Sequence, residues 1–229
     1  PLSRSLPAPV DGLIVAPRES APGDRYLRLL AMAKPIGQLE RSRLYFVCEG
    51  AGDHGALTAL LEAALGGGAD LVQLRDKDAD DERLIASSPV FRAAADRHGA
   101  LFVINDRPDL VAACAADGVH VGQDDAPVAE ARRIAGPDAI VGLSTHSPAE
   151  LDAALDAAGD ARPDYVSVGP VWETPTKAGR PAAGLAYVEH AAARAAGLPW
   201  FAIGGIGPAN LASVTAAGAR RIAVVRAIR

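Results

Sequence analysis

Basic and amide side chains gather directly after one short apolar run of the sequence. Gln73, Arg75 and Lys77 alternate in the segment QLRDK, so an extended chain points all three to the same side. Two cations and an amide on one face are suited to an anion with several oxygen atoms, such as a diphosphate. Lys177, in the segment TPTK after a later apolar run, supplies a further cation, and Lys77 and Lys177 are two of only three lysines in the chain.

Carboxylates follow two other apolar runs, at Asp106 and Asp125. Beside the cations they would repel an anionic ligand unless a divalent cation lies between them. Mg²⁺ is usually held by one or two carboxylates together with substrate phosphates and water. The sequence therefore predicts a Mg²⁺ site at Asp106 and Asp125. Asp125 also precedes Ala126-Pro127, where a helix N-cap is the alternative.

A second anion site is predicted near Gly204 and Gly205, which follow the seventh apolar run. Barrels of parallel strands commonly hold a phosphate at this point on backbone amides. The hydroxyls of Thr174 and Thr176 could add donors, and a tight turn is the alternative for the two glycines. His120 and His146 are interpreted as structural residues.

The elements that must position these residues are eight short apolar runs whose starts lie 17 to 35 residues apart. Each is four or five residues long and rich in Val, Ile or aromatic residues, which is typical of strands buried on both faces of a parallel sheet. Seven segments with helical periodicity separate them, which predicts a (β/α)₈ TIM barrel of the α/β class. An open doubly wound sheet is the alternative, although no G-x-G-x-x-G follows the first run. The eight runs are residues 44–47, 71–74, 101–104, 118–121, 140–143, 165–168, 200–203 and 221–225.

Two regions differ in pattern. Residues 1–43 are interpreted as an N-terminal extension, with a short amphipathic helix expected over Asp24–Lys34, and residues 44–229 as the barrel domain. The helix that should follow the eighth strand is missing before Arg229, so we expect further residues beyond it. Because the sequence begins at Pro1 without Met, we also expect that it starts inside a longer precursor.

Composition excludes several classes of protein. A net charge of -5 has the wrong sign for a protein that neutralises phosphate backbones, so nucleic acid is not an expected partner. Every apolar run is too short to cross a membrane. Cys48 and Cys114 lie 66 residues apart, in no zinc-ligand spacing, and we expect buried thiols in a reducing, cytoplasmic compartment. The oligomeric state is open, and a homo-oligomer is one possibility.

Seven segments, in order and at matching intervals, carry a resemblance to the thiamine-phosphate synthase family. The resemblance covers the chain from Leu44 to its end and implies a (β/α)₈ barrel. It implies condensation of 4-amino-5-hydroxymethyl-2-methylpyrimidine diphosphate with a thiazole phosphate, in which diphosphate leaves first and the thiazole nitrogen captures the resulting cation. The segments are VQLRDK (72–77), IND (104–106), DGVHVGQDD (117–125), GLSTH (142–146), VGPVWETPTK (168–177), AIGGI (202–206) and VVRAI (224–228).

The resemblance also assigns site residues. It implies Mg²⁺ on Asp106 and Asp125, and it gives catalytic roles to Lys177, Arg75, Lys77 and Ser144. Many family members carry Ser at the position of Arg226, whose guanidinium would either pair with phosphate or point away. The implied pyrimidine diphosphate residues are Gln73, Leu74, Arg75, Asp76, Lys77, Asn105, Ser144 and Lys177, and the implied thiazole phosphate residues are Thr174, Pro175, Thr176, Gly205, Val225 and Arg226.

Three alternatives remain from the sequence. A thiazole phosphate tautomerase of the same fold would need the phosphate site but not the aspartate pair. A non-catalytic sensor of thiamine phosphates could lose the Mg²⁺ ligands without penalty. A phosphosugar isomerase or lyase would need an acid or base, for which only His146 and Glu173 are available.

Overall fold

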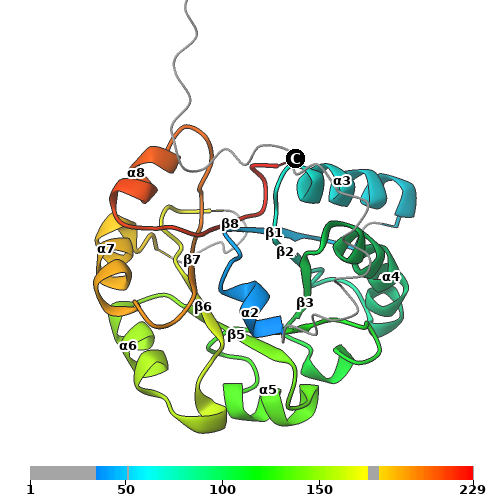
Figure 1. The fold of residues 1–229 in the computed structure, drawn as a ribbon, viewed down its shortest axis with the longest axis horizontal. Helices are drawn as coiled ribbons and strands as arrows, with labels where there is room; N and C mark the ends of the chain where they lie inside the picture. The colour runs from blue at the N-terminus through cyan, green and yellow to red at the C-terminus, as the bar shows by residue number, and fades with distance from the viewer. Residues whose placement is uncertain (1–34, 51, 175–180, 229) are drawn as a thin grey trace, which may run out of the picture.

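A computed structural model describes residues 35–50, 52–174 and 181–228. Eight parallel strands form a closed barrel in which each strand pairs with the next and β8 pairs with β1 (Figure 1). The predicted (β/α)₈ barrel is therefore confirmed, and all eight predicted runs are strands. The strands are β1 (Leu44–Cys48), β2 (Leu71–Leu74), β3 (Leu101–Asn105), β4 (Gly118–Val121), β5 (Ile140–Thr145), β6 (Tyr165–Val168), β7 (Trp200–Ile203) and β8 (Ile222–Val224).

Helices surround the barrel, as Figure 1 shows, but one connection differs from the prediction. Between β3 and β4 the chain forms only a 3₁₀ turn, η1 (Pro108–Leu110), so the expectation of seven helices between the strands is wrong there. Residues 106–117 leave no room for a full helix and its two loops. The remaining elements are α3 (His54–Gly66), α4 (Asp81–His98), α5 (Val128–Ala135), α6 (Pro148–Asp156), η2 (Gly159–Ala161), α7 (Gly184–Arg194) and α8 (Leu211–Ala216).

A short helix before the first strand, α2 (Pro35–Leu39), lies across one end of the barrel (Figure 1). Leu39 is fully buried against the apolar residues inside the barrel. The guanidinium of Arg221 donates hydrogen bonds to the backbone oxygens of Ser42, at 3.0 Å, and Glu40, at 2.7 Å. Residues 35–43 thus pack at the amino ends of the strands. The helix predicted over Asp24–Lys34 lies outside the described residues.

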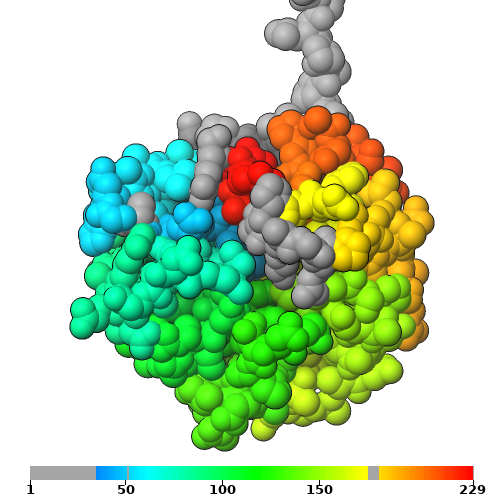
Figure 2. Space-filling model, turned by 180° about the vertical axis from the view of Figure 1, so that it is seen from behind, coloured from blue at the N-terminus to red at the C-terminus, as the bar shows by residue number. Residues whose placement is uncertain are grey.

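The opposite face, shown in Figure 2, carries the carboxyl ends of the strands. The side chains inside the barrel change from apolar to polar toward this face. On β2, the inward positions run from Leu71 to Gln73, and on β5 they run from Ile140 to Ser144. No helix among the described residues is both long and apolar enough to cross a membrane.

Aspartates fix the register of alternate strands. Asp70, Asp117 and Asp164 come directly before β2, β4 and β6. Each carboxylate accepts a hydrogen bond from a backbone N–H near the start of the preceding strand, which is β1, β3 or β5. This satisfies amide groups at the amino ends of those strands, which would otherwise lack a partner. The bonds come from Arg43 to Asp70 at 2.7 Å, from Phe102 to Asp117 at 2.8 Å and from Val141 to Asp164 at 2.7 Å.

Arginines complete two of these contacts. Arg92 lies 2.9 Å from the Asp117 carboxylate and Arg132 lies 3.1 Å from that of Asp164. The four side chains are at most 24% exposed, so each aspartate charge depends on its arginine for compensation, while Arg92 also pairs with the exposed Asp96 at 2.8 Å.

We expect the substitution Asp117→Ala to lower the free energy of unfolding by about 3 kcal/mol, because it leaves the Phe102 amide without its acceptor and Arg92 with only the more exposed carboxylate of Asp96. Chemical denaturation of the variant beside wild type measures this loss. The control is Asp138→Ala, since Asp138 is exposed. Equal stability of the two variants would contradict the assigned role.

Candidate active site

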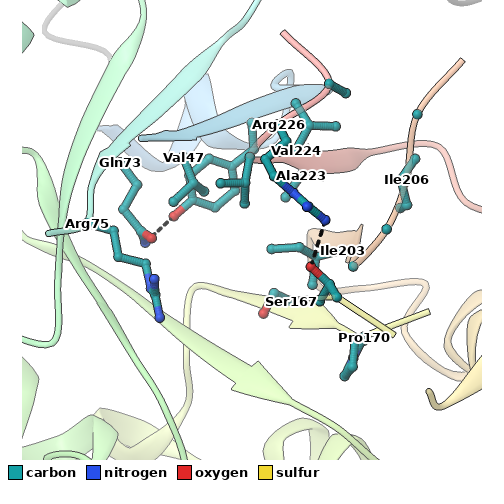
Figure 3. A pocket seen from close by; sticks show the side chains of 18 of the residues that line it. Val47, Gln73, Arg75, Ser167, Pro170, Ile203, Ile206, Ala223, Val224 and Arg226 are labelled. Atoms are coloured by element: carbon teal, nitrogen blue, oxygen red, sulfur yellow. Dashed lines mark hydrogen bonds between the residues drawn. The ribbon is translucent and has the colours of Figure 1, made fainter. Parts of the chain in front are cut away.

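A cavity of about 410 Å³ opens at the carboxyl ends of the strands (Figure 3). Side chains from all eight strands, or from the segments directly after them, line it. Its walls include most of the described residues predicted for the site. Those that line it are Gln73, Arg75, Asn105, Ser144, Thr174, Gly205, Val225 and Arg226.

Alternation along β2 and the residues after it divides the predicted residues into two groups. Gln73 and Arg75 point into the cavity (Figure 3). Leu74 instead lies in the hydrophobic layer between barrel and helices, and the carboxylate of Asp76 lies 3.3 Å from the guanidinium of Arg83. The side chains of Leu74 and Asp76 are thus directed away from the cavity. The ammonium of Lys77 lies 3.5 Å from the carboxylate of Asp106.

Asp106 and Asp125 lie side by side. Asp106 takes a left-handed backbone conformation, with φ of 59°, directly after β3. Burial raises the pKa of Asp106, and a hydrogen bond with Asp125 and the charge of that carboxylate raise it further, while Lys77 acts in the opposite direction. The Asp125 carboxylate accepts the backbone N–H of Gly122 at 2.8 Å. The helix α5 has Pro127 as its N-cap, so Asp125 does not cap that helix.

The two carboxylates suit a divalent cation. Two acids in contact, one with a raised pKa, gain from a cation that removes their mutual repulsion. Within the described ranges, no group of three or more His, Cys, Asp or Glu side chains could hold a metal. A pair of carboxylates could hold Mg²⁺, which would complete its oxygen shell with phosphate and water.

The loop after β7 is held open by glycine and asparagine. Gly204 has φ of 103°, and a Cβ there would lie 2.5 Å from the Cα of Pro170. The amide of Asn210 accepts from the Gly207 N–H and donates to the Gly205 oxygen, both at 2.9 Å. Gly204 therefore lets the loop after β7 pack directly against Pro170, and both Gly204 and Gly205 line the cavity.

Arg226 faces this loop from the end of β8. Its guanidinium donates to the hydroxyl of Thr174 at 3.4 Å (Figure 3). A cation and a hydroxyl thus meet at the cavity, where the sequence predicts a phosphate. Three predicted residues lie outside the described residues: Pro175 and Thr176, predicted for the thiazole phosphate, and Lys177, predicted for the diphosphate.

Three cavity residues with buried polar side chains were not among the predicted ligands: Tyr45, His120 and Ser167. Each is at most 7% exposed. The imidazole of His120 lies 3.0 Å from the Ser144 hydroxyl, so a residue interpreted as structural forms part of the cavity floor. The available signal was a polar residue inside an otherwise apolar strand, as in GVHV and YVSV.

Comparison with known proteins identifies the family. The family model described as thiamine monophosphate synthase matches residues 44–228. The chain belongs to the thiamine monophosphate synthase family. A curated relative named thiamine-phosphate synthase, from Thermobifida fusca, is 52% identical over 191 residues, covering 83% of this chain and 86% of the relative. Another of that name, from Acidothermus cellulolyticus, is 50% identical over 190 residues, covering 83% and 88%.

A solved structure agrees with this membership. Thiamine phosphate pyrophosphorylase from Pyrococcus furiosus superposes with a TM-score of 0.69 at 31% identity, covering 82% of this chain and 87% of that one. The resemblance predicted from seven motifs is confirmed, and these relatives carry the name of a synthase rather than that of a tautomerase or a sensor.

The raised pKa of Asp106 predicts a stability effect within this synthase-family site. Asp106→Asn removes a charge that burial and Asp125 oppose, and Asn tolerates left-handed backbone. We expect the variant to be more stable than wild type at pH 7. The gain should shrink as pH falls through the raised pKa, and vanish below about pH 4, where the carboxyl is protonated in both states. Denaturation at several pH values measures it.

Asp138→Asn is the control, as an exposed carboxylate. If Asp106→Asn were destabilising by the same amount at every pH, the carboxylate would not carry the electrostatic cost assigned to it.

Proposed function

We propose that the chain condenses 4-amino-5-hydroxymethyl-2-methylpyrimidine diphosphate with a thiazole phosphate, giving thiamine phosphate and diphosphate. The observation that carries the proposal is the contact of Lys77 with the Asp106–Asp125 pair beside the cavity that Arg75 lines. Cations together with a carboxylate pair suit a diphosphate bound with Mg²⁺, whereas the cations alone or the carboxylates alone would not. The curated relatives of this chain have the corresponding name.

The pyrimidine diphosphate would lie between β2, β3 and β5. Arg75 supplies positive charge on the cavity wall, where Asn105 and Ser144 supply uncharged polar groups. Lys77 adds a second positive charge at the Asp106 carboxylate. Lys177 completes this set in the proposal. Asp106 and Asp125 would hold Mg²⁺, which when bound would neutralise charge on the departing diphosphate.

The reaction needs charge stabilisation and placement more than it needs a base. The bond between the pyrimidine methylene and the diphosphate oxygen breaks, and its electron pair leaves with diphosphate. The lone pair of the thiazole nitrogen then forms the new bond to the methylene carbon, so no proton has to move. Preorganised cations at the leaving group favour this step, and a shared cavity brings the two substrates together.

The thiazole phosphate would bind on the side of β6, β7 and β8. Thr174, Gly205, Val225 and Arg226 line that side, and Pro175 and Thr176 belong to the same proposal. The contact between Arg226 and Thr174 directs the guanidinium toward the cavity. We therefore propose that Arg226 binds the phosphate where many relatives have Ser.

The carboxylate pair favours condensation over tautomerisation, because isomerising a thiazole phosphate involves no departing diphosphate.

Small molecules are the expected partners. Both cysteines are buried thiols, which supports the prediction of a cytoplasmic protein.

The test is formation of thiamine phosphate from purified protein, Mg²⁺, the pyrimidine diphosphate and the thiazole phosphate, with each omitted in turn. We expect product only when all three are present. Asp106→Ala and Lys177→Ala should each lower turnover at least about a hundredfold, because each removes charge stabilisation of the leaving group.

Asp124→Asn is the matched control, since Asp124 is an exposed carboxylate in the loop that holds Asp125. Near-normal turnover in Asp106→Ala or Lys177→Ala would contradict the proposed site. Tight binding of both substrates without product would favour the sensor.

A further inference from the structure

A chain of hydrogen bonds runs through the centre of the barrel beneath the cavity. The Gln73 amide nitrogen donates to the Tyr45 hydroxyl at 2.5 Å (Figure 3). The Tyr45 and Tyr165 hydroxyls are 3.2 Å apart, and the Tyr165 hydroxyl is 3.0 Å from Nδ1 of His120. Nε2 of His120 is 3.0 Å from the hydroxyl of Ser144. All five residues are at most 7% exposed, and all except Tyr165 line the cavity.

Each hydroxyl in this chain has one proton to donate, and each bond between two members needs one donor and one acceptor. With Gln73 donating to Tyr45, both tyrosine hydroxyls accept and donate within the chain when Tyr45 donates to Tyr165 and Tyr165 donates to Nδ1 of a neutral His120. The proton of His120 then lies on Nε2 and is donated to Ser144. Burial raises the pKa of both tyrosines, which keeps both hydroxyls protonated.

The packing of the barrel forces these groups together. The ring of Phe201 packs edge-on against both tyrosines, with centroids 5.4 Å from Tyr45 and 5.7 Å from Tyr165. A Cβ at Gly142 would lie 2.2 Å from Cζ of Tyr165 and 2.6 Å from Nδ1 of His120. The absence of a side chain at Gly142 thus lets the phenol and the imidazole meet.

The direction of the chain determines what the cavity presents to a ligand. One N–H of the Gln73 amide is donated to Tyr45, and the carbonyl oxygen on the other side of the amide is left as an acceptor for a ligand in the cavity. At the other end, Ser144 accepts from His120 and, at 3.3 Å, from Ser167, which leaves the proton of Ser144 to be donated. Turning the Gln73 amide round would require every bond along the chain to reverse.

We propose that Tyr165 is a positioning residue that, through Tyr45 and His120, fixes Gln73 as an acceptor and Ser144 as a donor, so that the site selects an aminopyrimidine over an oxopyrimidine. This rests on the proposed function for the identity of the ligand. An exocyclic amino group donates to the fixed Gln73 oxygen, whereas an oxo group would place two acceptors against each other. A mismatch of this kind at buried polar groups discriminates strongly between analogues.

The first test is made on the ligand-free protein. Nitrogen-15 chemical shifts of the imidazoles, with the His120 signals assigned by their loss in His120→Gln, report which nitrogen carries the proton. We expect His120 to carry it on Nε2 in wild type and to show a mixture of tautomers in Tyr165→Phe. A proton on Nδ1 in wild type, or an unchanged tautomer in Tyr165→Phe, would overturn the proposal.

Tyr187→Phe is the matched control. Tyr187 is also a buried tyrosine, but its hydroxyl donates to Thr145, at 2.7 Å, and not to a member of the chain. The variant should therefore leave the His120 tautomer as in wild type.

The second test compares KM for the natural pyrimidine diphosphate and for its 4-oxo analogue. Wild type should favour the amino compound at least about a hundredfold. Tyr165→Phe and Tyr45→Phe should each reduce this preference about tenfold, because the Gln73 amide can then turn round, while KM for the thiazole phosphate stays unchanged. A purely structural role would weaken both pyrimidines equally and would overturn the proposal.

Tyr45→Phe keeps the proposal falsifiable if Tyr165→Phe does not fold. It removes the hydroxyl that Gln73 contacts, so it should reduce the preference. Tyr165 can then donate only to Nδ1 of His120 within the chain, so the His120 tautomer should be preserved. Loss of neither the preference nor the tautomer, or loss of both, would contradict the order of donors. Failure of wild type to make thiamine phosphate would refute the proposed function alone, because the tautomer measurement needs no substrate.

Discussion

Closure of eight parallel strands on themselves is the constraint on which the rest of this molecule depends. Alternate residues of every strand must point into a narrow interior where water cannot satisfy a polar group. At the amino ends this interior is apolar and is covered by Leu39 of α2. Toward the carboxyl ends, the inward positions become polar, and their side chains must find one another or a ligand.

That constraint explains why the site residues come from so many strands. Beyond the apolar residues at the amino ends, no single strand contributes more than two or three inward positions. A hydrogen-bonded chain from β2 through β1, β6 and β4 to β5 satisfies the buried groups, and the charged residues occupy the rim beyond them. The same barrel therefore provides a layer of neutral hydrogen-bonding groups and, beyond it, a rim of charged groups. These are the two properties that a ring with a diphosphate tail requires.

Much of this arrangement could be predicted from the sequence. Short apolar runs at strand-and-helix spacing indicate a parallel sheet buried on both faces, and eight such runs with no G-x-G-x-x-G after the first favour a barrel over an open doubly wound sheet. The alternation in QLRDK correctly placed Gln73 and Arg75 on the inner side, whereas Lys77, predicted for the same side, is not among the residues that line the cavity. The same rule turns Leu74 and Asp76, which the resemblance implied as ligands, outward. The positions of Asp106 and Asp125 after adjacent strands also indicated that the two lie near each other, although a cation was expected between them where the structure has a direct contact.

Other features could not be predicted. The third connection has a helical pattern too short to become a helix, because residues 106–117 must also complete two loops. His120 and Ser167 are single polar residues in buried strands, and only the register of neighbouring strands decides whether such residues face the barrel interior or the helices. The bonds between Tyr45, Tyr165 and His120 depend on three strands at once, and on the space that Gly142 leaves.

The central claim is that the Asp106–Asp125 pair and the nearby cations form a diphosphate site only together with a divalent cation. Titration calorimetry of inorganic diphosphate into the protein, with and without Mg²⁺, tests this most directly. We predict measurable binding with Mg²⁺ and at least about tenfold weaker binding without it, because two carboxylates beside the anion then remain uncompensated. Equal affinity under both conditions would contradict the claim.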